Sequence, residues 1–297
     1  MAITVTQLTS FLAVIRGGSV TAAADELVVT QPSVSSALAS LSRELGCELF
    51  ERSGRGIRPT AAGAAFAPYA ADVIGLLASG REAAREAAAI AGRRLRIVAV
   101  TTAAESFVPP FIHSFSEQRP DVELTLDVGN REYVLNRVLT HAADVAIAGK
   151  PPPDDRLEAV PCAENKIVCI TAPDDPAAAA RPLSADALAD RVWLLREPES
   201  ETRALNQQFL RDHGIDPRTL TLGSNGAIRQ AASCGLGISL ISRSTVAADL
   251  AAGRLGELRL KSAPPPRPWF VLVSTVGPVR PVVREFVDFA ASTSAPR

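Results

Sequence analysis

Residues 21–38 read TAAADELVVTQPSVSSAL, and this stretch decides the fold of the N-terminal part of the chain. The small side chains of Ala23 and Ala24 allow two helices to cross closely. Thr30 can cap the second helix, because its hydroxyl can accept a hydrogen bond from an amide of the first turn. The larger apolar side chains that would fill the junction are Leu27, Val34 and Leu38. We therefore expect a tight helix pair whose second helix begins directly after Thr30.

The second helix of this pair carries short polar side chains on the side away from the junction. They are Gln31, Ser33, Ser35, Ser36 and Ser40. Such a helix is slim enough for a DNA major groove, and its amide and hydroxyl groups can meet base edges or phosphates. An ordinary helical hairpin with a polar face would show the same pattern. The segment by itself leaves both interpretations open.

Helical spacing of apolar residues extends over residues 5–49 and predicts three short helices. The first ends at Gly17-Gly18, since glycine tolerates the left-handed conformation of a helix end. Ser19 or Thr21 can cap the second helix, which ends near Val28. The third helix runs to Gly46 and has a proline in its first turn, where the missing amide is not needed.

Residues 51–60, ERSGRGIRPT, have the length and turn residues of a short two-stranded wing. The first sixty residues contain equal numbers of acidic and basic side chains, so this part of the chain is neutral. Three of its five arginines nevertheless lie within seven residues, at Arg52, Arg55 and Arg58. We therefore expect a local basic tip on a neutral unit.

A long alanine-rich helix is predicted from residue 61 to about residue 91. Its larger apolar side chains include Phe66, Val73, Leu76 and Leu77. An exposed helix of this length between domains usually needs a partner, so we interpret it as a dimerising linker. A core helix of one domain is the alternative. Pro68 and Asp72 argue against a membrane span.

From Arg93 onward, runs typical of strands alternate with runs typical of helices. The predicted strands are 95–100, 122–128, 144–148, 167–171, 192–195, 237–241 and 269–274. The predicted helices are 106–118, 132–140, 185–189, 202–212, 227–233 and 244–252. This alternation predicts parallel-rich sheet covered by helices. About two hundred residues exceed what one such sheet needs, so we expect two α/β lobes with a cleft between them.

Several classes of function find no support in the sequence. The four cysteines and three histidines lack zinc-ligand spacing. A redox pair of Cys162 and Cys169 is one hypothesis, and buried thiols acting as small hydrophobic groups are the preferred alternative. Nucleophile-elbow and phosphate-loop motifs are absent from the sequence, which argues against an enzyme and predicts no cofactor. The N-terminus lacks the pattern of a secretory signal, so we expect a cytoplasmic protein.

The stretch from Val5 to Gly63 resembles the DNA-binding head of the LysR-type transcriptional regulators. The matching residues are Leu8, Phe11, Ala23, Ala24, Leu27, Gln31, Pro32, Val34, Ser35, Leu41, Leu45, Gly46, Leu49, Phe50, Glu51, Arg52, Thr60, Ala62 and Gly63. The resemblance implies a winged helix-turn-helix at 1–60, a dimerising linker helix at 61–92 and an α/β effector-binding domain at 93–297.

The implied effector-binding domain is similar to periplasmic binding proteins. Lobe I would comprise about 93–162 and 268–297, and lobe II about 163–267. The resemblance further implies a homodimer formed through the linker helix, assembled into a homotetramer. The sensor stretch 224–243, SNGAIRQAASCGLGISLISR, is most similar to the regulators of carbon-fixation operons.

The resemblance also assigns residues to DNA. The implied DNA-binding residues are Thr21, Thr30, Gln31, Pro32, Ser33, Ser35, Ser36, Arg52, Arg55 and Arg58. Members of the family often have arginine where Ser36 stands, so one contact is shortened or absent here. Together with the neutral charge of this part of the chain, this departure predicts weak non-specific binding and reliance on tetramer avidity.

The implied effector lies between the lobes, near Thr101-Thr102 and near segment 199–203. The candidate effector-binding residues are Thr101, Thr102, Ser200, Thr202, Arg203 and Asn225. Hydroxyls and free amides at helix N-termini favour a carboxylate or phosphate, so we expect a small anion. Glu199 and Glu201 stand where glycine is common in the family, and they would repel an anion unless they point outward. A purely capping role for Ser200 and Thr202 is the alternative.

These interpretations predict a transcription regulator that binds a double-stranded DNA operator and responds to a small anionic effector. RNA polymerase is a further partner compatible with this prediction, and no membrane is involved. An architectural DNA-binding protein with a ligand-insensitive sensor is the main alternative. An enzyme is the second alternative.

Overall fold

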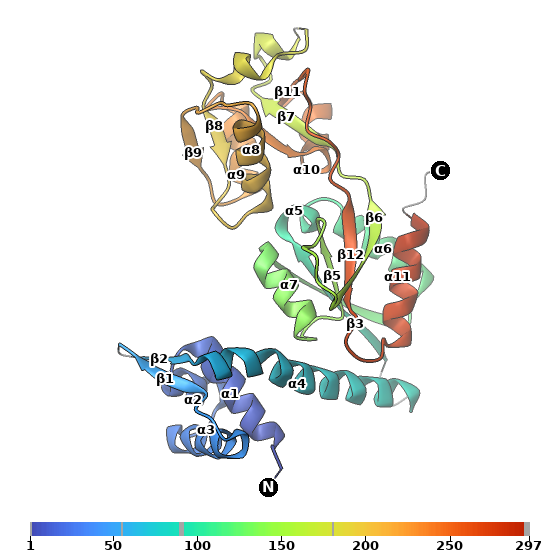
Figure 1. Cartoon of the computed structure of the whole chain (residues 1–297). Coiled ribbons are helices and arrows are strands. Elements are labelled where there is room, and N and C mark those ends of the chain that lie inside the picture. Colours follow the sequence, from blue (N-terminus) through green and yellow to red (C-terminus); the bar gives the residue numbers. More distant parts are fainter. Residues whose placement is uncertain (1, 55, 89–91, 180, 294–297) are drawn as a thin grey trace. The chain divides into compact units, whose positions relative to one another are not determined.

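The computed structural model describes residues 2–54, 56–88, 92–179 and 181–293 (Figure 1). The chain forms two compact units. The first contains residues 1–91 together with 139–142, and the second contains residues 92–138 and 143–297.

The first unit begins with three helices and a β-hairpin. They are α1 (Val5–Gly17), α2 (Val20–Leu27), α3 (Gln31–Leu45), β1 (Phe50–Ser53) and β2 (Gly56–Pro59). Each helix begins at a hydroxyl cap that accepts a hydrogen bond from an amide of the first turn; the caps are Thr4, Ser19 and Thr30. Left-handed Gly18 and Gly46 end α1 and α3. The predicted helices, the wing and the Thr30 cap are confirmed, and Ser19 rather than Thr21 caps α2.

The core of this unit has two small apolar clusters. Phe11 is fully buried, and its ring lies 5.3 Å from that of Phe50 and 5.4 Å from that of Phe66. In the other cluster, Ala23 and Ala24 are 0% and 2% exposed, which confirms the predicted close helix crossing. These clusters fix α3 while leaving its polar side uncovered.

Helix α4 (Ala61–Ala87) follows the wing. Thr60 caps it by accepting from the Gly63 amide and also donates to the Glu48 carbonyl at 2.8 Å. A Cβ at Gly63 would lie 2.1 Å from the Leu49 carbonyl oxygen, so only glycine fits this joint. Among the described residues, α4 meets the length and hydropathy test for a membrane span, which is weak evidence because core helices also pass it.

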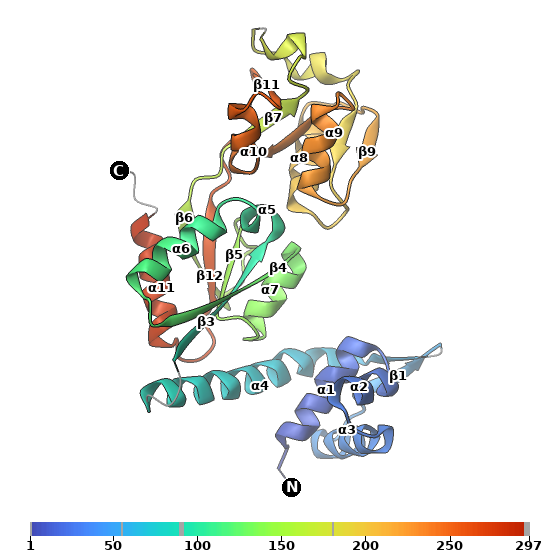
Figure 2. The same cartoon turned by 180° about the vertical axis from the view of Figure 1, so that it is seen from behind.

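The second unit begins with lobe I, a five-stranded sheet of order β4-β3-β5-β12-β6. The strands are β3 (Arg93–Val100), β4 (Val122–Gly129), β5 (Val145–Ala148), β6 (Leu157–Ala163) and β12 (Trp269–Ser274). β3 runs parallel to β4 and β5, whereas β12 is antiparallel to β5 and β6. The helices are α5 (Thr101–Ala104), α6 (Val108–Gln118), α7 (Arg131–Leu139) and α11 (Pro281–Thr293). α6 and α11 share one face of the sheet, and α7 covers the other (Figures 1 and 2).

Lobe II contains a three-stranded sheet, a two-stranded ladder and three α-helices. The strands are β7 (Ile167–Thr171), β8 (Trp193–Leu195), β9 (Thr219–Thr221), β10 (Ser239–Ser242) and β11 (Gly256–Leu258). The helices are α8 (Glu201–Asp212), α9 (Asn225–Ser233) and α10 (Arg243–Ala251), with 3-10 turns η1 (Pro176–Ala178) and η2 (Ala185–Leu188). The chain passes between the lobes twice, from β6 to β7 and from β11 to β12 (Figure 2).

Each predicted strand has a counterpart in the structure. In lobe II the prediction of parallel sheet holds for the pair β8 and β9 but is wrong for the sheet around β7. Both neighbours of β7, which are β10 and β11, run antiparallel to it. Strand–helix alternation gives the order of elements along the chain, whereas strand direction depends on pairing between distant segments. The prediction also missed β6, β9, β11 and α11, and the predicted helix at 185–189 is the 3-10 turn η2.

Candidate functional site

The polar side of α3 is open in the first unit. Of the predicted DNA-binding residues, those that the structure describes are all exposed: Thr21, Thr30, Gln31, Pro32, Ser33, Ser35, Ser36, Arg52 and Arg58. Arg55 lies outside the described residues. Val34, between two of the serines, is fully buried, so the helix has one apolar side and one uncovered polar side.

The first turn of α3 orders its own hydroxyls. Thr30 Oγ1 lies 2.8 Å from Ser33 Oγ, and it also accepts from the Ser33 amide at 3.4 Å. The side-chain amide of Gln31 has no hydrogen-bond partner within the described parts of the chain. An exposed amide at a helix N-terminus can donate to and accept from one adenine edge at the same time. The side-chain amide of Gln31 is therefore available for a contact of this kind.

The arginines of the wing differ in their partners. Arg58 Nε lies 2.8 Å from Glu51 Oε1 on the facing strand, so its charge is already offset. Arg52 faces Ile57 across the hairpin and makes no ion pair with any residue that the structure describes. Nearer the N-terminus, Arg16 of α1 pairs with Glu26 of α2. The unit therefore offers fewer free positive charges than its arginine count indicates.

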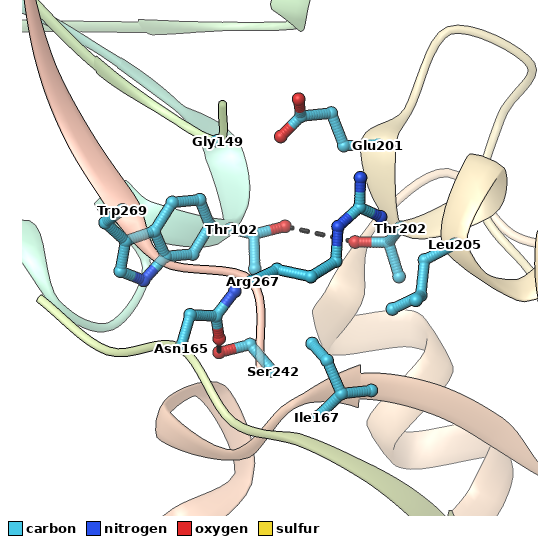
Figure 3. A pocket seen from close by; sticks show the side chains of 10 residues that line it. All are labelled: Thr102, Gly149, Asn165, Ile167, Glu201, Thr202, Leu205, Ser242, Arg267 and Trp269. Atoms are coloured by element: carbon cyan, nitrogen blue, oxygen red, sulfur yellow. Dashed lines mark hydrogen bonds between the residues drawn. The ribbon is translucent and has the colours of Figure 1, made fainter. Parts of the chain in front are cut away.

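In the second unit, side chains of the two lobes meet across a cleft. Thr102 Oγ1 of lobe I lies 3.2 Å from Thr202 Oγ1 of lobe II (Figure 3). Asn225 Nδ2 of lobe II donates to Thr102 Oγ1 at 3.1 Å and to Glu105 Oε2 at 2.8 Å. Three of the predicted effector-binding residues are thus joined by hydrogen bonds.

The two glutamates near the start of α8 reach toward lobe I. Glu201 forms an ion pair with Arg131, the first residue of α7, and Glu199 accepts from Asn130 Nδ2 at 2.6 Å. The Glu201 side chain is only 20% exposed. Glu201 therefore points into the cleft rather than outward, and Arg131 offsets its charge there.

A buried arginine lies behind these contacts. The Arg196 side chain is 4% exposed and donates to both carboxylate oxygens of Glu197 and to Asn225 Oδ1, each at 2.7 Å. Burial by itself would raise the pKa of the Glu197 carboxyl, but hydrogen bonds and the charge of Arg196 hold that pKa below its ordinary value. Arg203 donates to the Arg196 carbonyl at 2.7 Å and to Thr221 Oγ1 at 3.2 Å, so its guanidinium stays within lobe II.

The cleft holds two small cavities. The first, of about 30 Å³, is lined by Thr102, Gly149, Asn165, Ile167, Glu201, Thr202, Leu205, Ser242, Arg267 and Trp269 (Figure 3). The second, of about 20 Å³, is lined by Val100, Thr101, Thr102, Gly129, Asn130, Arg131, Arg196, Glu197, Ser200 and Glu201. Such volumes hold about one or two waters, so a metabolite needs movement of the facing side chains or lobes to enter.

Four of the predicted effector-binding residues line these cavities: Thr101, Thr102, Ser200 and Thr202. Asn225 and Arg203 lie outside the linings and only bind residues that line them, Thr102 and Arg196 respectively. Thr101 and Thr102 are the first two residues of the four-residue helix α5. Ser200 caps α8, as the alternative held, by accepting from the Thr202 amide at 3.2 Å. Thr202 instead faces Thr102.

Four of the cavity residues were not predicted from the sequence. Asn165 and Arg267 lie on the two segments that connect the lobes, between β6 and β7 and between β11 and β12. Asn130 and Arg131 directly follow β4. Polar side chains at the ends of predicted strands were the available signal.

Neither a metal site nor a redox pair gains support. No group of three or more potential metal ligands occurs in the described part of the chain. Cys162 lies in β6 of lobe I and Cys169 in β7 of lobe II, and burial raises the pKa of each thiol to about 12. At neutral pH both side chains are protonated thiols, which disfavours the redox hypothesis.

A winged helix-turn-helix in the same chain as a two-lobed α/β domain with a polar cleft defines a ligand-responsive, DNA-binding transcription regulator. Residues 5–64 match the family described as "Bacterial regulatory helix-turn-helix protein, lysR family", and residues 89–295 match "LysR substrate binding domain". The chain belongs to the LysR family of transcriptional regulators.

Relatives support the predicted similarity to carbon-fixation regulators. The chain is 36% identical over 287 residues to the HTH-type transcriptional regulator CbbR of Rhodospirillum rubrum, covering 95% of this chain and 94% of the relative. It is 32% identical over 295 residues to the RuBisCO operon transcriptional regulator of Acidithiobacillus ferrooxidans, covering 98% and 94%. These relatives are transcription regulators and not enzymes.

A solved structure resembles the second unit. The regulatory domain of Synechocystis PCC6803 CcmR in complex with 2-PG aligns with a TM-score of 0.63 at 32% identity. The alignment covers 68% of this chain and 97% of that one. The two-lobed fold expected from the sequence is thereby confirmed.

Proposed function

We propose that this regulator controls a carbon-fixation operon and that a small anionic metabolite, bound between lobe I and lobe II, sets its activity. The observation that carries the proposal is the meeting of Thr102 and Thr202, one from each lobe, at the wall of a shared cavity. A ligand there touches both lobes, so its affinity differs between closed and open arrangements and shifts their populations.

The chemistry of the cleft favours an anion. Hydroxyl donors come from both lobes, and Arg131, Arg196 and Arg267 line the two cavities. The CcmR regulatory domain, 32% identical to this chain, was solved with 2-PG. We therefore take 2-phosphoglycolate, an anionic metabolite, as the first candidate to test.

The test is thermal denaturation of the full-length protein with 2-phosphoglycolate and other small carboxylates and phosphate esters. A ligand at a hundredfold excess over its Kd stabilises the folded state by about 2.7 kcal/mol. We expect a rise in Tm for the wild type and a smaller rise for Thr102→Val. If no metabolite stabilises the protein or alters its DNA binding, the architectural alternative holds.

For DNA, we propose that the first turn of α3 enters the major groove and that Arg52, Arg55 and Arg58 contact phosphate or the minor groove. The exposure of the described residues and the free amide of Gln31 support this assignment. We retain residues 1–60, 61–92 and 93–297 as the DNA-binding, linker and effector-binding parts.

We also propose that α4 pairs two subunits and that two such dimers form a cytoplasmic tetramer. Three apolar side chains at a spacing of four residues, Tyr69, Val73 and Leu77, are 69%, 52% and 49% exposed on α4. A helix from a second copy would cover this stripe. Sedimentation of Val73→Lys tests the proposal: a monomer supports it, whereas an unchanged oligomer contradicts it.

A further inference from the structure

We infer that Arg267 is the residue that binds the charged head group of the effector. The inference rests on the proposed function, because it names the anchor within the same cleft. It assigns the carboxylate or phosphate of the ligand to one guanidinium, which can hold such a group by two hydrogen bonds.

The other arginines near the cleft already have partners. Arg131 pairs with Glu201 and donates to the Lys150 carbonyl at 2.7 Å. Arg196 donates to Glu197 and Asn225, and Arg203 donates to a carbonyl and a threonine within lobe II. An entering anion would have to compete with these partners for the three guanidinium groups.

Arg267 differs in that its guanidinium makes no hydrogen bond or ion pair with any described residue. Its backbone is nevertheless anchored, because its amide donates to the Asn165 carbonyl at 2.9 Å. The side chain lines the first cavity, and Figure 3 shows its guanidinium extending toward Glu201 and Thr202. A fixed backbone with a free head group suits a ligand anchor.

The charges that line the two cavities lead to the same residue. Two acidic side chains, Glu197 and Glu201, are each paired with an arginine, Arg196 and Arg131 respectively. Arg267 is the remaining charged group in these linings, so it gives the two linings together a net positive charge. Without Arg267, the charged groups of these linings would all be paired with an opposite charge.

The groups around Arg267 complete an oxyanion site. A carboxylate or phosphate can accept two parallel N–H bonds from one guanidinium, and such charge-assisted bonds are about twice as strong as neutral ones. The Thr102 and Thr202 hydroxyls line the same cavity, and their mutual contact of 3.2 Å is long for an O–H···O bond. The anion's oxygen can replace that contact and receive a hydrogen bond from each lobe.

Arg267 also lies on the segment that returns the chain from β11 in lobe II to β12 in lobe I. Its cavity contains Thr102 from lobe I and Ser242 from lobe II. An anion on Arg267 therefore touches the crossing segment and both lobes, which links binding to their arrangement.

The test is isothermal titration of full-length wild type, Arg267→Gln, Arg267→Lys and Arg218→Gln with 2-phosphoglycolate, inorganic phosphate and glycolate. Arg218 is a matched control, because it is an exposed arginine of lobe II outside both cavity linings and removing it changes the net charge equally. We expect Arg267→Gln to bind 2-phosphoglycolate about 10- to 100-fold more weakly, Arg267→Lys to fall between, and Arg218→Gln to match the wild type. Loss of phosphate or of glycolate binding identifies the head group that Arg267 holds.

The outcomes separate the two proposals. If the wild type binds and Arg267→Gln binds equally well, the role of Arg267 is wrong while the cleft site stands. An equal loss in Arg218→Gln also overturns it, because general charge would then explain the effect. If the wild type binds none of the probes, both proposals fail for this ligand class. Unliganded thermal melts of each variant report whether it is folded.

Discussion

The helix-turn-helix unit and the effector-binding unit build their binding groups in opposite ways. In the first, most candidate contacts lie between Thr21 and Ser36, on one helix pair, and they face outward. In the second, Thr102 meets a residue 100 positions away and another 123 positions away. DNA recognition is thus encoded locally, whereas the effector site exists only once two lobes have folded and closed.

The largest effect is expected from a substitution in the core of the first unit. Phe11→Ala leaves a cavity between Phe50 and Phe66 and should lower the free energy of unfolding of that unit by about 4 kcal/mol. We expect operator binding to be lost while 2-phosphoglycolate binding persists. Urea denaturation and titration measure the two effects, with exposed Val5→Ala as control. Loss of both activities would show that the two sites are not independent.

A buried cluster of charged residues allows the stability of lobe I to be tested in the same way. Asp144 is 4% exposed and pairs with Arg96 at 2.8 Å and Arg280 at 2.7 Å. Asp144→Asn leaves the arginines without a counter-charge and should cost about 3 kcal/mol at neutral pH. Effector binding should fall with stability, whereas the first unit should still bind DNA.

The same cluster predicts a pH dependence. Burial by itself raises the pKa of Asp144, but the hydrogen bonds from Arg96 and the charges of Arg96 and Arg280 outweigh it and hold the pKa below its ordinary value. A depressed carboxyl pKa stabilises the fold fully above the unfolded value of about 3.9, and this contribution is lost as pH falls through the native value. The stability gap between wild type and Asp144→Asn should therefore narrow below about pH 4. A constant gap would contradict the role of the charge.

Gln31 tests local recognition in the first unit. Gln31→Ala removes a side chain that the structure leaves free, so we expect specific operator binding to weaken about 10- to 100-fold. Binding to non-specific DNA should change little. Fluorescence anisotropy with both DNAs measures the ratio, and equal losses on both would assign Gln31 to the phosphate backbone instead.

Substitution of the two described wing arginines should affect DNA binding less, and each variant serves as a control for the other. Arg52 is unpaired among the described residues, whereas Glu51 offsets Arg58. Arg52→Ala should lower the slope of log K for DNA binding against log salt concentration by about 1, and it should weaken binding several-fold. Arg58→Ala should do less. The reverse order would mean that the Glu51 contact is given up on DNA.

The smallest expected effect concerns Glu201. Glu201→Gln removes a negative charge from the cleft and releases Arg131, so anion affinity should rise by about fivefold or less. Asp216→Asn, which removes an exposed carboxylate of lobe II outside both cavity linings, is the control. A lower affinity in Glu201→Gln would contradict this expectation. It would mean that the ion pair between Glu201 and Arg131 holds the site in its binding geometry, and that this outweighs the repulsion between the Glu201 carboxylate and the ligand.

The contrast between the units also explains what the sequence could predict. Gly17-Gly18, Thr30 and the wing signal their structure within a few residues, so the first unit was predictable almost to its caps. Thr102 and Thr202 were expected from the resemblance to the family. Arg267 was not, because its role depends on which arginines find partners, and that is decided by packing across the cleft.

The missed helix α11 had a readable signal. Pro281 begins it, and buried Val282, Val283, Phe286 and Val287 follow at helical spacing. The antiparallel pairing of β7 had none, since strand direction follows from how distant segments return to the sheet.

One measurement tests most directly the claim that a DNA-binding unit and an anion-sensing unit act together. A labelled operator, selected by the protein from a random pool, is titrated with wild type and Arg267→Gln in the presence of 2-phosphoglycolate and other small carboxylates and phosphate esters. We expect at least one anion to change the operator Kd or footprint of the wild type, and Arg267→Gln to lose that response. Operator binding that no anion alters would contradict the claim.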